Sequence, residues 1–143
     1  MKITNGKIII LIGVIHTLLT PVVYFNQFSL FARHLFFRIN DGFMEPSINY
    51  ETFAAFWCLY FGLTLFPLGV LLDSTEKRKM PIPKSFIMVY AGLILVGVYM
   101  IPFGGMTVFM LPHLVYMTAS NWQNGTAISH NNNTLTPRNE QSL

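Results

Sequence analysis

Two histidines, His16 and His113, are the first candidates for a functional role in this sequence, because imidazole can carry a proton, donate a hydrogen bond or ligate a metal. Both stand in long stretches without Asp, Glu, Lys or Arg. At about 1.5 Å per helical residue, we expect them at a similar depth, roughly 13–15 Å below one surface of the molecule. Three interpretations are open: hydrogen bonding between helices, polar contacts in a ligand pocket, and axial ligation of a haem.

The side chains expected beside the histidines favour binding over catalysis. Thr17, Trp57 and Tyr60 could line the same space, so the candidate ligand-binding residues are His16, Thr17, Trp57, Tyr60 and His113. Their spacing assembles no nucleophile, base and acid, so no catalytic residue is predicted. Zinc takes further ligands, and the sequence places no carboxylate at this depth. We therefore expect no metal site and no resident cofactor.

The elements that must position these residues are apolar helices. Residues 8–26, 52–72 and 85–137 contain no Asp, Glu, Lys or Arg. A charge at the centre of a bilayer costs about 2.5–3.5 kcal/mol on insertion scales, and about 20 apolar residues span the hydrocarbon core as a helix. The sequence therefore predicts an all-α fold, an integral membrane four-helix bundle in residues 1–120, with spans at about 7–27, 51–72, 84–101 and 105–120. Asn5 and Gly6 are expected to break the chain before the first span.

Composition agrees with this fold class. Hydrophobic residues make up 52% of the chain and charged residues only 10%, against about 25% charged in a typical soluble domain. The basic residues lie in loops and tails, which suits contact with lipid headgroups. They form no broad basic face, so we expect no nucleic-acid partner. Cys58 is the only cysteine, so the chain cannot form an internal disulfide.

The distribution of Lys and Arg predicts the orientation of the spans. One side would carry seven basic residues and the other only two, Arg33 and Arg38; the seven are Lys2, Lys7, Lys77, Arg78, Lys79, Lys84 and Arg138. The positive side of a membrane protein is cytoplasmic. We therefore predict a multi-pass protein of the inner (plasma) membrane with both termini in the cytoplasm.

Two segments outside the spans have distinct patterns. In the connection 26–50, apolar residues recur at helical spacing and predict an amphipathic helix in the membrane interface; they are Phe28, Phe31, Ala32, Leu35, Phe36 and Ile39. Arg33, His34 and Arg38 lie off that stripe. The helix could cap the outer end of the bundle or act as a substrate lid. The Asn-rich residues 121–143 predict a disordered polar tail.

Small residues predict where the helices touch, because close backbone approach drives helix association in lipid. They recur on the second span at Ala54, Cys58, Gly62 and Gly69, and on the first at Gly13, Thr17 and Thr20. Antiparallel packing would bring these two seams together. Gly92 and Gly97 could serve the third span in the same way, and Pro67 and Pro112 predict kinks.

The sequence also resembles a known family. The resemblance is carried by the run from Leu11 to Thr17, the run from Ala55 to Gly62, and single positions further on, namely Gly69, Asp73, Pro81, Pro83, Pro102, Gly104 and Pro112. Together they resemble an uncharacterised family of small bacterial four-helix membrane proteins, classed as a domain of unknown function. The resemblance covers about residues 6–116, and the Asn-rich tail departs from it. It implies an inner-membrane location and no reaction, and it marks His16, Thr17 and Trp57.

The sequence thus favours a non-enzymatic integral membrane protein that packs with, or binds, a partner. Its expected partners are membrane lipid and either a second copy or another membrane protein. The alternative is a binder of a lipid-like or apolar small molecule in a cavity near His16, Trp57 and His113. An enzyme or a haem carrier is the third hypothesis.

Overall fold

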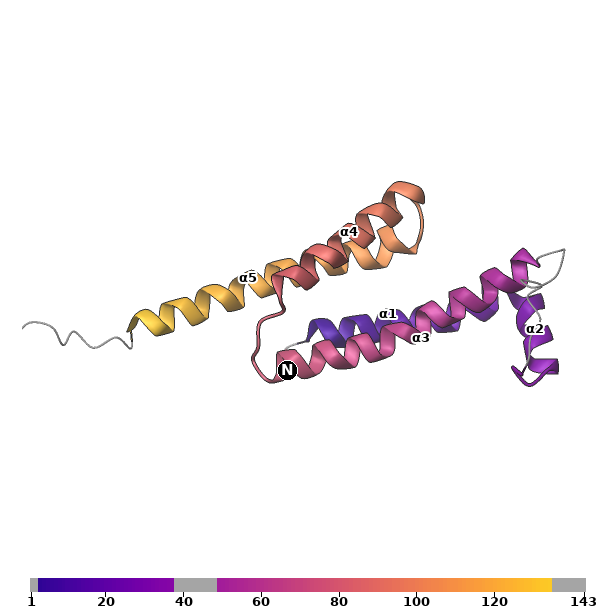
Figure 1. The fold of residues 1–143 in the computed structure, drawn as a ribbon, viewed down its shortest axis with the longest axis horizontal. Helices are drawn as coiled ribbons and strands as arrows, with labels where there is room; N and C mark the ends of the chain where they lie inside the picture. Colours follow the sequence, from indigo (N-terminus) through magenta and orange to yellow (C-terminus); the bar gives the residue numbers. More distant parts are fainter. Residues whose placement is uncertain (1–2, 38–48, 135–143) are drawn as a thin grey trace, which may run out of the picture. The chain divides into compact units, whose positions relative to one another are not determined.

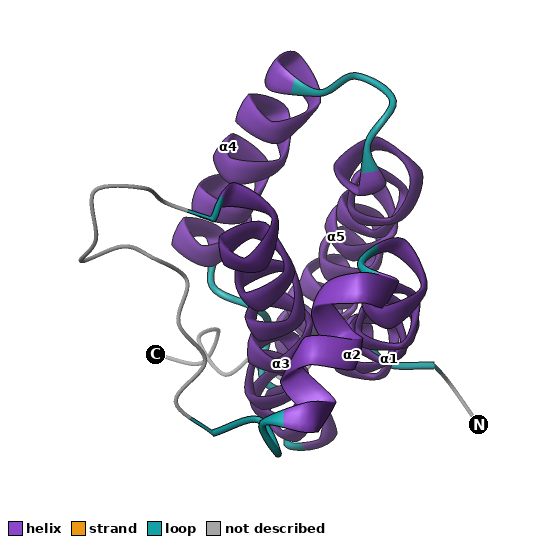
Figure 2. Ribbon diagram, turned by 90° about the vertical axis from the view of Figure 1, so that its right-hand side faces the viewer, coloured by secondary structure: helices purple, strands orange, loops and turns teal. Residues whose placement is uncertain are grey.

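The computed structural model describes residues 3–37 and 49–134, with 123–134 described by their backbone alone. All regular elements in these ranges are helical, which confirms the predicted all-α class (Figure 2). They are α1 (Asn5–Val23), α2 (Phe25–Arg33), α3 (Tyr50–Lys77), α4 (Lys84–Met100), the π-helix η1 (Met106–Met110) and α5 (Leu111–Thr134). The chain forms two compact units, Met1–Asp73 and Ser74–Leu143.

α1 begins earlier than the predicted span and ends earlier as well. Thr4 is its N-cap, with a side chain that accepts the backbone N–H of Lys7 at 3.3 Å. Asn5 and Gly6, which the sequence suggests as a break, are therefore the first residues of the helix. At the other end Tyr24 leaves helical geometry, with φ −113° and ψ 46°. The predicted span 7–27 is thus divided between α1 and α2.

α2 occupies the start of the predicted interfacial helix. Phe31 is buried, and its ring packs against Phe28 and Phe36. Leu35 was expected on the same apolar face but is 86% exposed. The helix ends at Arg33, and Leu35 takes a φ of 52°, so it leaves the helical stripe. Arg38 and Ile39 lie outside the described residues.

α1 and α3 pack antiparallel along a seam of glycines within the first unit (Figure 1). Gly6 lies against Gly69 and Asp73, while Gly13 lies against Gly62. A Cβ at Gly13 would be 3.1 Å from the carbonyl oxygen of Gly62. The predicted seam is therefore confirmed for the first and second spans, and Gly6 extends it by a position that the sequence did not suggest.

In the second unit α4 and α5 lie side by side and are joined by the turn that precedes η1 (Figure 1). The backbone N–H of Leu111 donates to the Met106 carbonyl, five residues back, so the helix is widened just before Pro112. Gly97 packs against Met106, as its small size suggested. The prediction for Gly92 is wrong, since a Cβ there would meet no atom of the described residues within 4 Å.

The C-terminal part of the chain differs from the predicted disorder. α5 continues to Thr134, well past the predicted end at 120. No proline interrupts the chain between Pro112 and Pro137, and an existing helix adds residues more readily than a new one nucleates. Residues 135–143 lie outside the described residues.

Candidate functional site

His16 belongs to a hydrogen-bond network that joins α1 to α3. Its Nε2 lies 3.0 Å from the backbone carbonyl oxygen of Cys58. A carbonyl oxygen can only accept, so Nε2 must carry the proton and donate it. The carbonyl of His16 in turn accepts the hydroxyl of Thr20 at 2.8 Å. The imidazole ring also packs edge-on against Phe61, with 5.3 Å between ring centroids.

The thiol of Cys58 closes this network. Cys58 Sγ lies 3.4 Å from both Thr20 Oγ1 and His16 Nε2. Because the single proton of Thr20 goes to the His16 carbonyl, the thiol donates to Thr20 rather than accepting from it. Nε2 already holds its proton, so it cannot take another from the thiol. Cys58 and His16 therefore do not form a nucleophile–base pair, and the network fastens the two helices.

Thr17 is a packing residue of the same seam. Its Oγ1 is buried and has no hydrogen-bond partner among the described residues. It lies beside Gly62, where an added Cβ would come within 2.5 Å of it. The glycine at 62 leaves the room that Thr17 fills. The structure thus places both His16 and Thr17 beside Gly62 in the contact with α3, and it adds Cys58 as the hydrogen-bond partner of His16.

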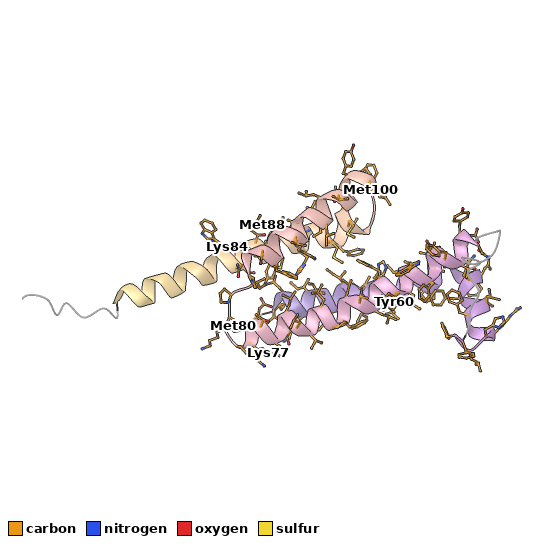
Figure 3. The ribbon with its side chains drawn as sticks, in the orientation of Figure 1. Tyr60, Lys77, Met80, Lys84, Met88 and Met100 are labelled. Atoms are coloured by element: carbon orange, nitrogen blue, oxygen red, sulfur yellow. The ribbon has the colours of Figure 1, made fainter. Side chains whose placement is uncertain are left out.

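Trp57 and Tyr60 lie on a different face of α3. Both are half exposed, and each ring contacts the other and Phe56. Phe53 extends the group by its contact with Trp57. Figure 3 shows Tyr60 on this helix. The four side chains make an aromatic ladder along one face of α3, in which Phe56, Trp57 and Tyr60 are exposed and Phe53 is partly buried. The seam with α1 is formed by Cys58, Gly62 and Gly69.

His113 has its own partners in the second unit. It is 3% exposed, and its Nδ1 lies 2.9 Å from the hydroxyl of Tyr90. That hydroxyl donates to Met110 Sδ at 3.3 Å, so it accepts its second bond from the Nδ1–H of His113. The two rings meet edge to face, with centroids 5.7 Å apart. This group joins the middle of α4 to the start of α5.

The two histidines are therefore each engaged by protein groups within their own unit. Sequence reasoning missed Tyr90 and Met110, and it placed Cys58 in the seam without its contacts to His16. One feature of the sequence could have suggested Tyr90 as the partner of His113. It is a polar side chain, and it lies about as far before the turn at 101–105 as His113 lies after it. That the histidines line one shared space stays a prediction. In the described ranges, no group of three or more His, Cys, Asp or Glu side chains is placed to hold a metal ion.

Removing the Tyr90 hydroxyl is expected to weaken the second unit. In Tyr90→Phe the buried Nδ1 of His113 loses this partner, and polar contacts between membrane helices contribute about 0.6–1.7 kcal/mol. We expect a loss of about 1 kcal/mol in unfolding free energy, measured by denaturant titration in detergent. Tyr99→Phe is the matched control, because Tyr99 lies on the same helix and is 88% exposed. An equal loss in both variants would contradict the role assigned to Tyr90.

The fold and these networks define a class: a small all-helical protein whose polar side chains fasten pairs of apolar helices. Within that class, the chain belongs to a family of unknown function, DUF6463, which matches residues 1–124. The predicted resemblance to a domain of unknown function is thereby confirmed, over a longer range than the motifs indicated. No curated protein and no solved structure matches the chain.

Proposed function

We propose that this protein is an integral membrane protein without enzymatic activity, which packs with or binds a partner in the bilayer. The observation that carries the proposal is the large number of exposed apolar side chains on helices that touch through glycines and hydrogen bonds. Burial of apolar surface favours folding in water, so a water-soluble fold would be expected to cover most of these side chains.

The exposed faces support this proposal. Leu18 on α1 is 67% exposed and Leu93 on α4 is 65% exposed. Met88 and Met100 are likewise exposed along α4 (Figure 3). Soluble monomers rarely expose continuous apolar patches larger than a few hundred Å². α1 and α3 are each long and apolar enough to cross a membrane, and α4 is a shorter apolar helix.

The groups between the helices support it as well. Lipid gives apolar helices no reason to associate, so small residues and hydrogen bonds must hold them together. The glycine seam and the His16–Cys58–Thr20 network supply both in the first unit. In the other unit, the hydrogen bond between Tyr90 and His113 joins the helices. These contacts are what we expect of helix pairs that fold in lipid.

The orientation and the partner are part of the proposal. We infer that both termini and the Lys- and Arg-rich segment between α3 and α4 are cytoplasmic, since these three parts of the chain hold seven of its nine Lys and Arg residues. The aromatic ladder at Phe53, Phe56, Trp57 and Tyr60 is the exposed face best suited to a partner helix. The alternative is that the protein binds an apolar small molecule, which would use the same aromatic side chains as contacts.

Fractionation of cells that express the full chain tests the proposal. We expect the protein to stay with the membrane pellet after alkaline carbonate treatment and to require detergent for extraction. A peripheral protein should be released by carbonate, and a soluble one should remain in the supernatant. Recovery of a monodisperse species in aqueous buffer without detergent would overturn the proposal.

A further inference from the structure

The turn between α3 and α4 gathers positive charge on exposed side chains. Lys77, Arg78, Lys79 and Lys84 are all exposed, and Glu76 is the only acidic residue among them. All five belong to the second unit. Lys77 ends α3 and Lys84 begins α4, and both are marked with Met80 in Figure 3. We call the segment 77–84 the basic turn.

The backbone of the basic turn is held in a defined shape. The N–H of Lys79 donates to the Glu76 carbonyl at 2.9 Å, and the N–H of Met80 donates to the Thr75 carbonyl at 3.2 Å. This pair of bonds is a Schellman motif, in which the residue after the C-cap takes a left-handed conformation. Lys79 is that residue, with a φ of 58°.

Hydrogen bonds to Asn121 hold the C-terminal part of the basic turn. Ile82 is buried, and its N–H donates to Asn121 Oδ1 at 3.0 Å. The amide nitrogen of Asn121 donates back to the Ile82 carbonyl at 3.2 Å. Pro81 and Pro83 flank Ile82 and restrict the backbone further. The cations are therefore displayed from a preformed turn, which reduces the entropy lost on binding.

Two of the cations stand where folding alone would favour another residue. Glycine is the usual residue at the left-handed position of a Schellman motif, because a side chain there is strained. Lys84 is the first residue of α4, whose N-cap Pro83 makes no side-chain hydrogen bond, and a cation is unfavourable at a helix N-terminus. By contrast, Lys77 and Arg78 are favourable at the C-terminus of α3. Lys79 and Lys84 thus call for an explanation other than stability.

We propose that the basic turn binds the phosphate headgroups of anionic phospholipids in the adjacent leaflet; this inference rests on the proposed membrane function. Juxtamembrane clusters of Lys and Arg are attracted to anionic lipid surfaces. Met80 lies among the cations and is half exposed, so an apolar side chain accompanies the charges as it would at a lipid interface. An anionic lipid supplies both the phosphate and the acyl region, whereas a nucleic acid or free phosphate supplies only the first.

The test removes the charges of Lys79 and Lys84 in the full chain and compares the variants with the wild type, all purified in neutral detergent. Native mass spectrometry and thermal unfolding are followed while phosphatidylglycerol or phosphatidylcholine is added. Lys79→Gly is expected to fold with a Tm equal to or above that of the wild type, because it relieves the left-handed strain. Its affinity for phosphatidylglycerol should fall about fivefold, and a further fall of about fivefold should follow Lys84→Gln in the double variant.

Arg33→Gln is the matched control, since it removes one exposed cation from the other unit. It should leave phosphatidylglycerol affinity unchanged. Equal affinity in wild type and Lys79→Gly, an equal fall in Arg33→Gln, or displacement of the lipid by inorganic phosphate at comparable concentration would each overturn the inference. The proposed membrane function would be contradicted by a different result, namely a wild-type chain that stays soluble without detergent. The two proposals can therefore fail independently.

Discussion

Replacing Gly6 by alanine is expected to disrupt the packing of α1 against α3. An added Cβ would lie 2.2 Å from the backbone nitrogen of Asp73 and 2.4 Å from the carbonyl oxygen of Gly69. These are main-chain atoms of a neighbouring helix, so no flexible side chain can move aside. Overpacking a tight contact costs about 1–3 kcal/mol and occasionally more. We expect Gly6→Ala to reach at least the upper end, about 3 kcal/mol, by thermal or denaturant unfolding in detergent.

Gly92→Ala is the matched control for that prediction. The same methyl group is added within a helix, but no atom of the described residues lies within 4 Å of the new Cβ. Alanine is the better helix former by about 0.8–1.0 kcal/mol, so Gly92→Ala should be neutral or slightly stabilising. If Gly6→Ala matched Gly92→Ala in Tm, the close approach of α1 to α3 near Gly6 would be wrong.

Leucine at position 62 is the second substitution for which we expect a large effect. The first added carbon would already lie 2.5 Å from Thr17 Oγ1 and 3.1 Å from His16 Cδ2, and leucine adds three more. The helices would have to part, which would also break the bonds from His16 and Thr20 to Cys58. We expect a loss of more than about 3 kcal/mol in detergent, measured by thermal unfolding with circular dichroism.

A double-mutant cycle tests the cause of that loss. Gly62→Ala places only the first carbon, whose closest neighbour is Thr17 Oγ1. Thr17→Ala removes that oxygen, so it should recover part of the stability lost in Gly62→Ala, with a coupling of about 0.5–3 kcal/mol for residues in contact. Strictly additive effects, or a Gly62→Leu variant as stable as the wild type, would contradict the seam.

Much of the helical architecture could be predicted from the absence of charge. An uncharged apolar run predicts a long helix from residue type alone. α3 and α4 accordingly begin within one residue of their predicted starts at 51 and 84. Small residues at regular spacing likewise predicted the contact of Gly13 with Gly62. These signals are local, since they depend on residue type and helical period alone.

The errors arise where a residue's role depends on its neighbours in space. Gly6 follows Asn5 and looked like a chain break, yet it is the residue that allows α1 to approach Asp73 most closely. Gly92 looked like a packing glycine, yet it faces open space in the described structure. A glycine serves a turn or a contact equally well, and only the opposing helix decides between them.

The same reasoning explains what was missed in the candidate site. His16 and His113 were found because a polar side chain is conspicuous in an apolar helix. Their partners, Cys58 and Tyr90, stand 42 and 23 residues away along the chain. No periodicity within one helix reveals which residue of another helix it will face. Thr20 was expected only as a small residue of the seam. Its hydroxyl also donates to the His16 carbonyl, which makes the Cys58 thiol a donor to Thr20.

The left-handed backbone at Lys79 bears on how this chain could be re-engineered. A procedure that ranks sequences by folding free energy would select glycine at this position and would count the exchange as an improvement. It would also delete a charge from the surface that we assign to lipid, without any warning in the stability data. Thermostabilised variants of this protein intended for structural work should therefore retain the native residue at 79.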